Sequence, residues 1–410
     1  MSGNVLSARS PGLSAVLSRS RVQLTLERLK EAAPRFVDIR REFHRHPELA
    51  FKEERTSARV AELLREFGYE VTTGLAGTGV VGTLRRGHGA RRLGLRADMD
   101  ALPIGEATGV EWASQTAGVM HACGHDGHTA SLLAAADFLA REGEFDGTLN
   151  LIFQPAEEMG GGAQKMVREG LFERFPVDAV YGLHNWPGVP TGHIGCVHGP
   201  AMASVDQALI TVHGKGGHGA QPHETVDPVV AAAHIITALQ TVVSRNVPPL
   251  DMGVITIGTI HGGIAPNVIP DSVQLHLTAR SYKPEVRELL RRRITEIART
   301  QAESFGATAE VDYRPGYPAV VNHPEETAFA REVAAGTFGE ARVQADFAPR
   351  TASEDFAYML QARPGAYLFF GNGEDSASLH SPRYDFNDEL LLPAALFWVR
   401  LAERYLAQGN

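Results

Sequence analysis

The segment at residues 120–130, MHACGHDGHTA, constrains this chain more than any other. Within it stand one thiol, three imidazoles and a carboxylate, and two glycines between them let the backbone turn tightly. Thiol, imidazole and carboxylate groups are the side chains that bind zinc-like ions. An isolated Cys-x-His is more often a helix start with capping or solvated histidines, so a metal site requires further ligand-type residues elsewhere in the chain.

Composition and charge exclude several classes of protein. The length of 410 residues allows about two or three domains and a large buried core. The net charge of −9 argues against a nucleic-acid-binding protein, which normally presents a basic face. Two cysteines make no disulfide framework, so we expect a reducing, cytoplasmic location. No apolar run reaches the roughly 18 residues that cross a bilayer, and residues 229–243 are interpreted as a packed helix, so no membrane partner is expected.

Apolar runs and helical periodicity alternate along most of the chain. Residues 1–20 lack Asp and Glu and are expected to form a flexible N-terminal arm. Helical spacing follows over residues 23–67, interrupted at the sequence HPE. Short strand-like runs then alternate with helices, which predicts an α/β fold with a mostly parallel sheet flanked by helices.

Polar side chains of the metal-binding kind stand where these strand-like runs end. In open α/β sheets, ligand sites collect at the carboxyl ends of the strands. Residues far apart in the sequence are therefore predicted to converge in one pocket. They are Asp98, Asp100, Glu157, Glu158, His184 and His380.

A separate pattern occupies residues 201–314. Strands are predicted at 207–213, 253–260, 272–281 and 307–313, and helices at 227–245 and 284–305. The order βαββαβ is that of a ferredoxin-like unit. We therefore expect an inserted domain at 201–314 and a catalytic domain formed by residues 21–200 and 315–410.

The ligand-type residues outnumber the needs of one catalytic zinc, which usually takes three protein ligands and water. Such a set suits two divalent ions about 3.5–4 Å apart. Zinc, manganese, cobalt and nickel all tolerate mixed sulfur, nitrogen and oxygen ligands. In the adjacent pair Glu157 and Glu158, one carboxylate can bind metal while the other contacts a metal-held water as a base. The five expected ligands are Cys123, His125, Glu158, His184 and His380.

Seven sequence segments together resemble one known family. They are RADMDALP at 96–103, residues 120–130, QPAEE at 154–158, GLHN at 182–185, GGHGA at 216–220, APNVIP at 265–270 and SEDF at 353–356. These segments, in this order, are similar to the dinuclear-metal aminoacylase/carboxypeptidase superfamily. The subgroup is that of hippurate hydrolases and indoleacetyl-amino-acid amidohydrolases.

The resemblance implies two metals per subunit, Mn²⁺ or Zn²⁺ with Co²⁺ or Ni²⁺ also compatible, held by those five ligands. It implies Glu157 as the general base that activates a metal-bridging water and then as the general acid. The reaction would cleave the amide bond of an N-acyl amino acid into a carboxylic acid and a free amino acid. It also implies an inserted lid domain that forms a homodimer or a dimer of dimers.

Further roles follow from the same resemblance. His218 would stabilise the oxyanion, Asn267 would hold the substrate, and Arg280 would clamp its carboxylate. Many members of the superfamily have a metal-binding His where this chain has Asp98. Asp100 is therefore expected to orient a ligand and not to bind metal itself.

Two other functions compete with the amidohydrolase. A carboxypeptidase or dipeptidase could use the same metal centre on a peptide bond. A protein of another class, a metal-dependent binding protein without turnover, would have no use for Glu157 beside a metal-held water. The preferred acyl group and amino acid do not follow from the sequence.

Overall fold

The computed structural model describes residues 13–344 and 346–407, which form two compact units. Unit 1 comprises residues up to Cys196 together with Pro324–Phe347 and Ala362–Asn410, and unit 2 comprises Val197–His323 and Ala348–Gln361. Residues 1–12 of the expected N-terminal arm lie outside the described part. Residues 13–20 belong to the first helix and not to an arm. The domain limits expected from the sequence stay a prediction.

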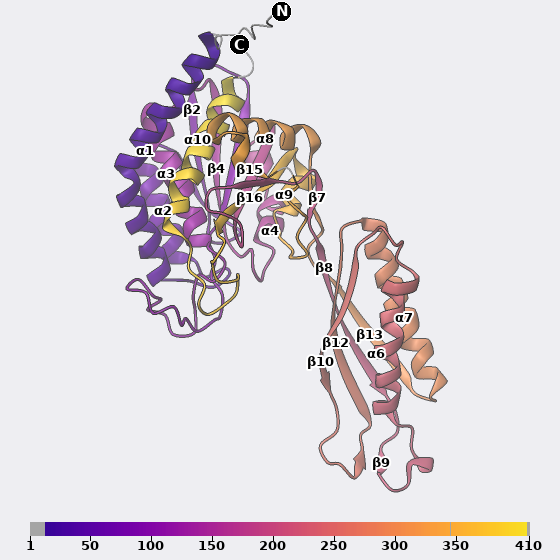
Figure 1. Ribbon diagram of the computed structural model, residues 1–410. Helices are drawn as coiled ribbons and strands as arrows, with labels where there is room; N and C mark the ends of the chain where they lie inside the picture. The colour runs from indigo at the N-terminus through magenta and orange to yellow at the C-terminus, as the bar shows by residue number, and fades with distance from the viewer. Residues whose placement is uncertain (1–12, 345, 408–410) are drawn as a thin grey trace, which may run out of the picture. The chain divides into compact units, whose positions relative to one another are not determined.

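Unit 1 is an α/β unit (Figure 1). Its helices are α1 (Leu13–Arg45), α2 (Glu54–Glu66), α3 (His125–Glu142), α4 (Gly162–Arg168), α5 (Leu171–Arg174), α8 (Pro324–Phe338) and α10 (Leu391–Ala407). Its strands are β1 (Glu70–Leu75), β2 (Gly79–Arg86), β3 (Arg92–Asp98), β4 (Gly147–Gln154), β5 (Ala179–Pro187), β6 (Ile194–Cys196), β15 (Val343–Gln344) and β16 (Gly365–Gly373).

The eight-stranded sheet of unit 1 has the order β1-β2-β4-β3-β5-β16-β6-β15. Its central strands β4, β3, β5 and β16 are parallel, whereas β1 pairs with β2, β2 with β4 and β6 with β16 in antiparallel fashion. The expectation of an α/β fold is confirmed, and the sheet is mixed outside its parallel centre. Because the central strands run in the same direction, their carboxyl ends meet at one edge of the sheet.

Helical periodicity explains where α2 lies and why it ends. Val60, Leu63 and Leu64 recur at helical spacing and are fully buried. Gly68 then follows the helix with φ of +92°, a left-handed conformation that terminates helices at low cost to glycine. The break between α1 and α2 falls where the sequence HPE predicts it.

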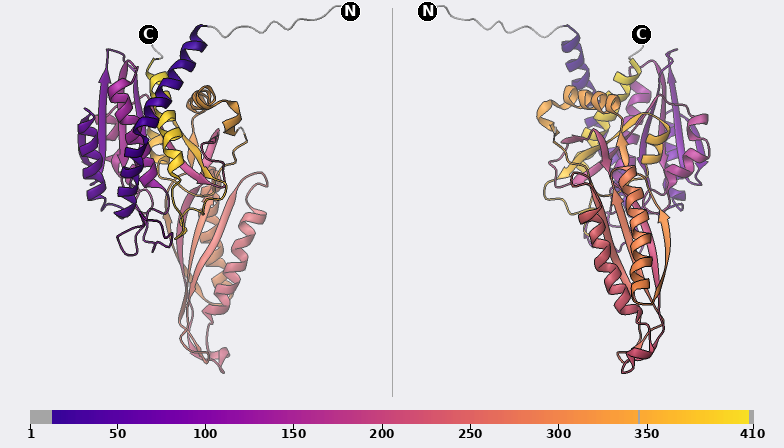
Figure 2. Two further views of the ribbon diagram at one scale, coloured as in Figure 1. Left: turned by 60° about the vertical axis from the view of Figure 1, so that its left-hand side comes forward. Right: turned by 90° about the vertical axis from the view of Figure 1, so that its right-hand side faces the viewer.

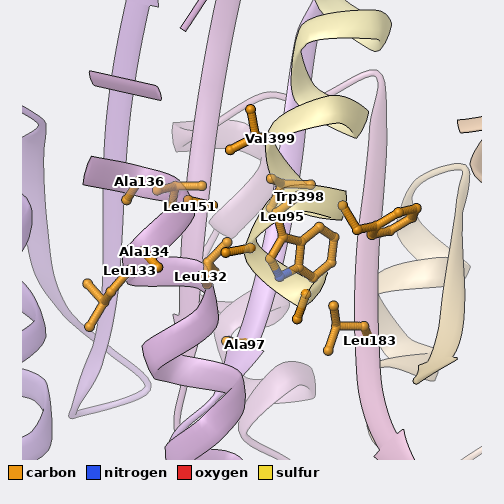
Figure 3. Packing of buried hydrophobic residues seen from close by; sticks show 14 of the residues in the cluster. Leu95, Ala97, Leu132, Leu133, Ala134, Ala136, Leu151, Leu183, Trp398 and Val399 are labelled. Atoms are coloured by element: carbon orange, nitrogen blue, oxygen red, sulfur yellow. The ribbon is translucent and has the colours of Figure 1, made fainter. Parts of the chain in front are cut away.

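One hydrophobic core joins the sheet of unit 1 to its helices. Figure 3 shows the layer between them, where Leu132 of α3 and Trp398 of α10 belong to the same buried cluster as Leu95 and Leu183 of the strands. All four side chains are at most 3 % exposed. This packing fixes α3 against the sheet, and the first residue of α3 is His125.

Unit 2 contains a four-stranded antiparallel sheet with two long helices (Figure 2). The sheet order is β10-β12-β8-β13, formed by β8 (Ser204–His213), β10 (Gly253–His261), β12 (Ser272–Ser281) and β13 (Thr308–Pro315). The helices are α6 (Pro228–Arg245) and α7 (Pro284–Ser304). The order βαββαβ is the one predicted for residues 201–314.

Smaller elements complete unit 2. They are β7 (Gly199–Met202), β9 (Gly217–His218), β11 (Val268–Ile269), β14 (Val320–Asn322) and α9 (Ala357–Ala362), whose last residue counts with unit 1. Short 3₁₀ turns lie at Pro222–Glu224 here and at Glu340–Arg342 and Asp388–Leu390 in unit 1. By length and composition alone, α6 could cross a membrane. Its residues Ala231, Ile235, Leu239 and Val242 are buried in the core of unit 2, as expected for a packed helix.

Candidate metal centre

The site of unit 1 is built at the carboxyl ends of the central strands. Strand β3 ends at Asp98, and Asp100 follows two residues later. Strand β4 ends at Gln154 and leads directly into the turn 155–158. His184 lies within β5 and not beyond its end, which differs from the sequence-based expectation.

The loop before α3 supplies two further groups. Gly124 has φ of +90°, so the chain turns sharply between Cys123 and His125. A Cβ on Gly124 would also lie 2.4 Å from Oδ1 of Asn185. Gly127, by contrast, lies inside α3 and makes no turn. A Cβ there would lie 2.3 Å from the ring of Phe386, so close packing accounts for this glycine.

The structure brings the five expected ligands together in two groups that share Cys123. The donor atoms of Cys123, His125 and His184 lie within 4.8 Å of one another, and so do those of Cys123, Glu158 and His380. The Cys123 Sγ atom is 3.3 Å from Nε2 of His184, and Nε2 of His380 is 3.1 Å from Oε1 of Glu158. Four of the five side chains are largely buried, whereas His380 is 51 % exposed. The cluster therefore has one side open to solvent.

Two donor atoms of this cluster lack hydrogen bonds, which tests whether the residues fit a metal. Nε2 of His125 and Oε1 of Glu158 are buried and make no aligned hydrogen bond, and the one close contact of Oε1 is with Nε2 of His380; burying a polar atom in this way is costly. The two atoms lie 4.0 Å apart. These two atoms, together with the thiol of Cys123 and the imidazole of His184, form a set of sulfur, nitrogen and oxygen donors that fits divalent metal ions.

The protonation of these groups depends on their burial and on nearby carboxylates. Burial lowers the pKa of His184 well below its usual value and leaves a neutral imidazole, whose Nδ1 donates to the carbonyl of Asn185 and whose Nε2 faces Sγ of Cys123. Burial raises the pKa of the Cys123 thiol, and the carboxylates of Glu158 and Glu157 raise it further. A metal must therefore displace a proton from Cys123.

His125 is surrounded by negative charge. Burial lowers its pKa, but Asp98, Asp100 and Glu158 outweigh this effect and raise the pKa to about 10. Its Nδ1 atom lies 3.3 Å from Oδ1 of Asp100, which orients the ring so that Nε2 faces the cluster. An excess of carboxylates around one imidazole favours a bound cation.

Asp98 makes its shortest contacts with Arg96 and His128. Its carboxylate lies 2.6 Å from Nη1 of Arg96 and 2.6 Å from Nδ1 of His128. Burial would raise the pKa of Asp98, but Arg96 and the histidines outweigh it and hold the pKa well below its usual range. Nε2 of His128 in turn lies 2.6 Å from Oδ1 of Asn185, the residue after the expected ligand His184.

The turn after β4 separates the two adjacent glutamates. Ala156 has φ of +54°, which is unusual for a residue with a Cβ atom. The backbone N–H groups of Glu157 and Glu158 donate to Oδ1 and Oδ2 of Asp100, at 3.0 and 2.9 Å. Glu157 is buried, and its carboxylate lies within 4.8 Å of donor atoms of His125 and Glu158. A buried carboxylate next to donor atoms of this kind can accept and return a proton.

The sequence did not predict a second buried charged cluster, which joins α1 to the start of α3. Nδ1 of His44 is 2.8 Å from Oδ2 of Asp126, and Nε of Arg40 is 2.9 Å from the same oxygen. Nε2 of His44 is 3.3 Å from Oε1 of Glu106. His44 is a fully buried member of this charged cluster. The sequence signal that could have indicated it is Asp126, an acidic residue directly after His125.

The remaining expected site residues lie in unit 2. His218 of β9 pairs with Val268 of β11, and the N–H of Gly219 donates to the carbonyl of Asn267 at 2.8 Å, so His218 and Asn267 are neighbours. Arg280 lies on β12, where Nη1 donates to the carbonyl of Thr351 at 3.0 Å. The expected roles of these three residues stay predictions.

Comparison with known proteins agrees with the resemblance inferred from the motifs. Residues 94–404 match the profile of Peptidase family M20/M25/M40. The chain belongs to peptidase family M20/M25/M40. It is 44 % identical over 371 residues to the hippurate hydrolase of Campylobacter jejuni, covering 90 % of this chain and 96 % of that one. It is 40 % identical over 373 residues to an N-acetyl-L-cysteine deacetylase of Bacillus subtilis, covering 90 % and 88 %.

A solved structure supports the same family. The YXEP protein of Bacillus subtilis, a dinuclear metal binding peptidase from the M20 family, superposes with a TM-score of 0.79 at 34 % identity. The match covers 92 % of this chain and 99 % of that one. As a member of the M20/M25/M40 family, the chain has the α/β fold expected from its sequence.

Proposed function

We propose that this protein is a metal-dependent amidohydrolase that cleaves N-acyl amino acids into a carboxylic acid and a free amino acid. The observation that carries the proposal is the turn after β4, which places Glu158 among the expected ligands and Glu157 beside them as a buried second carboxylate. A site that only binds metal would not require Glu157 as a base. The related hippurate hydrolase and N-acetyl-L-cysteine deacetylase support an N-acyl amino acid as the substrate class.

We propose two divalent ions, which Cys123, His125, Glu158, His184 and His380 would hold. Zn²⁺ and Mn²⁺ both tolerate such mixed donors. The relative described as dinuclear supports this number. When bound, the metals lower the pKa of a water molecule and polarise the carbonyl group that is attacked.

The residues of the chain then move the proton and hold the substrate. Glu157 takes the proton from the attacking water and returns it to the leaving nitrogen, which requires a carboxylate within about 3 Å of both atoms. His218 is proposed to donate to the developing oxyanion, and Asn267 and Arg280 to bind the substrate. The open side of the cluster at His380 admits the substrate.

We extend the proposal to the assembly and the location. The protein acts on small N-acyl amino acids as a homodimer, or as a dimer of dimers, in the cytoplasm. The net charge of −9 and the two buried, unpaired cysteines support a reducing compartment without nucleic-acid partners.

The test combines a substrate panel with Glu157→Gln. Protein loaded with Mn²⁺ or Zn²⁺ is incubated with N-benzoyl-glycine, N-acetyl-cysteine and dipeptides, and the free amine is measured. We expect hydrolysis of the N-acyl amino acids, and a fall in kcat of at least about 100-fold in Glu157→Gln because the general base is lost. The metal content of this variant, measured by mass spectrometry, stays at the wild-type level because the five ligands remain.

Three results would argue against the proposal. Hydrolysis of dipeptides alone would indicate a peptidase, which is how the YXEP protein of Bacillus subtilis is described. Near-normal kcat in Glu157→Gln would remove Glu157 from the role of base. No turnover of any substrate by fully loaded wild-type protein would favour a binding protein. Glu62→Gln, a change at an exposed position of α2, serves as the control and keeps wild-type activity.

A further inference from the structure

Glu53 is a buried carboxylate that belongs neither to the expected ligands nor to the base. It directly precedes α2, and its side chain is fully buried. A carboxylate in such a place normally caps the helix that follows. Glu53 makes no such capping bond. Its oxygens instead accept hydrogen bonds from two other segments of unit 1 and from the N–H of Phe51, two residues before it.

The two backbone partners of Glu53 share an unusual conformation. Oε1 accepts from the N–H of Ala156 at 2.9 Å and from the N–H of Phe51 at 3.0 Å. Phe51 has φ of +60° and Ala156 has φ of +54°, and neither is glycine. Left-handed residues with a Cβ atom persist only where surrounding contacts hold them. One carboxylate oxygen thus holds two strained residues at once.

The other oxygen of Glu53 has a different kind of partner. Oε2 accepts from Oγ1 of Thr78 at 2.6 Å. A hydroxyl can donate or accept, whereas a backbone N–H can only donate. Burial raises the pKa of Glu53, and its hydrogen bonds to Thr78 and Ala156 oppose this shift. The two N–H groups at Oε1 therefore require an acceptor at this position, whereas the Thr78 hydroxyl at Oε2 does not.

The turn after β4 has its three successive N–H groups held by two buried carboxylates. Ala156 donates to Glu53, and Glu157 and Glu158 donate to Asp100. The left-handed residue directly before the glutamates sets the direction in which each side chain leaves the backbone. Without Glu53 the N–H of Ala156 would be buried and unpaired, and its φ would relax toward negative values.

We propose that Glu53 is a positioning residue that holds Ala156 in the left-handed conformation and thereby aims Glu157 and Glu158 at the metal centre. Glu53 would act through the backbone and touch neither metal nor substrate. A displacement of about 1 Å at a reacting group can cost about 100-fold in rate, so a residue of this kind matters for turnover. The part of the inference that concerns activity rests on the proposed amidohydrolase function.

The experiment compares Glu53→Ala with Glu53→Gln in the full chain. The dissociation constant for Mn²⁺ and the values of kcat and KM at saturating Mn²⁺ are measured for each. Glu53→Ala is expected to weaken Mn²⁺ binding about 10-fold and to lower kcat about 10- to 100-fold with little change in KM, the range seen when groups behind metal ligands are removed. Glu53→Gln keeps the acceptor for Ala156 and is expected to stay within about threefold of wild type on each quantity.

Two further variants separate positioning from general loss of stability. Thr78→Val removes the partner of Oε2 and keeps both bonds to Oε1, so it is expected to lower the melting temperature and leave kcat within about threefold. Ala156→Gly added to Glu53→Ala is expected to recover at least about threefold in kcat, because glycine adopts positive φ without strain. Glu53→Asp keeps the charge but is one methylene too short, and it replaces Glu53→Ala if that variant does not fold.

Wild-type kcat and Mn²⁺ affinity in Glu53→Ala or Glu53→Asp would overturn the proposal. So would a loss in Glu53→Gln as large as that in Glu53→Ala, or no recovery with Ala156→Gly. If wild-type protein hydrolyses no N-acyl amino acid, the proposed function fails, but the Mn²⁺ dissociation constants of the variants still decide the role of Glu53.

Discussion

Asp100 and Glu53 hold the same turn, yet the chemistry of their partners differs. Both oxygens of Asp100 face backbone donors, because Oδ1 accepts from Glu157 and Oδ2 accepts from Glu158. Oδ1 also lies 3.3 Å from Nδ1 of His125. Glu53 has such donors on one oxygen only. An amide therefore fits at position 53 and does not fit at position 100.

For Asp100→Asn we predict weaker metal binding, although the asparagine side chain has the same shape as aspartate. The new NH₂ group would face the N–H of Glu157 or Glu158, and two donors would oppose each other in a buried site. We expect the Mn²⁺ dissociation constant to rise about 10- to 100-fold, as measured by isothermal titration calorimetry. Glu53→Gln is the matched control. Wild-type affinity in Asp100→Asn would show that Asp100 does not hold the turn.

At the scale of elements, a buried charged cluster ties α1 to the start of α3. Arg40 and His44 on α1 both contact Asp126, the second residue of α3. Burial lowers the pKa of His44, but Asp126 and Glu106 outweigh burial and the like charge of Arg40 and raise it to about 9. The His44 ring also faces the His121 ring at 6.3 Å between centroids. The folded protein therefore holds a proton on His44 that the unfolded chain releases near pH 6.5.

A stability that falls with rising pH follows from this cluster. Because the pKa of His44 is raised in the folded state, its contribution is fully present below about pH 6.5 and is lost as the pH rises through about 9. The shift corresponds to at most about 3 kcal/mol. We expect His44→Gln to be less stable than wild type at pH 6, and the difference to shrink by pH 9.5. Denaturation with urea at saturating Mn²⁺ measures it, and a difference independent of pH would contradict the assignment.

At the scale of the whole molecule, the two units have separate cores. The core of unit 2 consists of residues between Ala208 and Ala307, whereas all five expected ligands lie in unit 1. A ligand that binds only the folded state stabilises it by about 2.7 kcal/mol at 100 times its dissociation constant. Bound metal should therefore suppress local opening most in the segments that carry the expected ligands.

Chelation should therefore change local stability unevenly. We predict that removal of metal with EDTA speeds amide hydrogen exchange at residues 155–158 and at the start of α3. Exchange in β8 and β12 of unit 2 should stay the same, because neither strand carries a ligand. Hydrogen exchange followed by mass spectrometry checks this, with the Mn²⁺-loaded protein as the reference. An equal change in both units would contradict a metal centre confined to unit 1.

The local pattern of the sequence determined the elements and their order. Helical spacing around Leu63 and the left-handed Gly68 mark α2 and its end, and alternation in β12 places Val273 and Leu275 on its buried face. These signals depend on neighbours within a few residues, so the chain carries them without tertiary contacts. The strand ends also predicted that Asp100 and Glu158 meet at one edge of the sheet, whereas Cys123 and His125 come from the loop before α3 and His184 lies within β5.

Tertiary structure alone decided which buried groups support the site. Glu53 and Ala156 are 103 residues apart, and His44 and Asp126 are 82 apart, so no local pattern pairs them. Gly127 resembles a turn residue in the sequence, but the Phe386 ring explains it. A polar residue directly before a helix often caps it, and only the structure shows that Glu53 is buried and makes no capping bond. Periodicity is a property of nearby residues, whereas hydrogen-bond partners in a core depend on how distant segments pack.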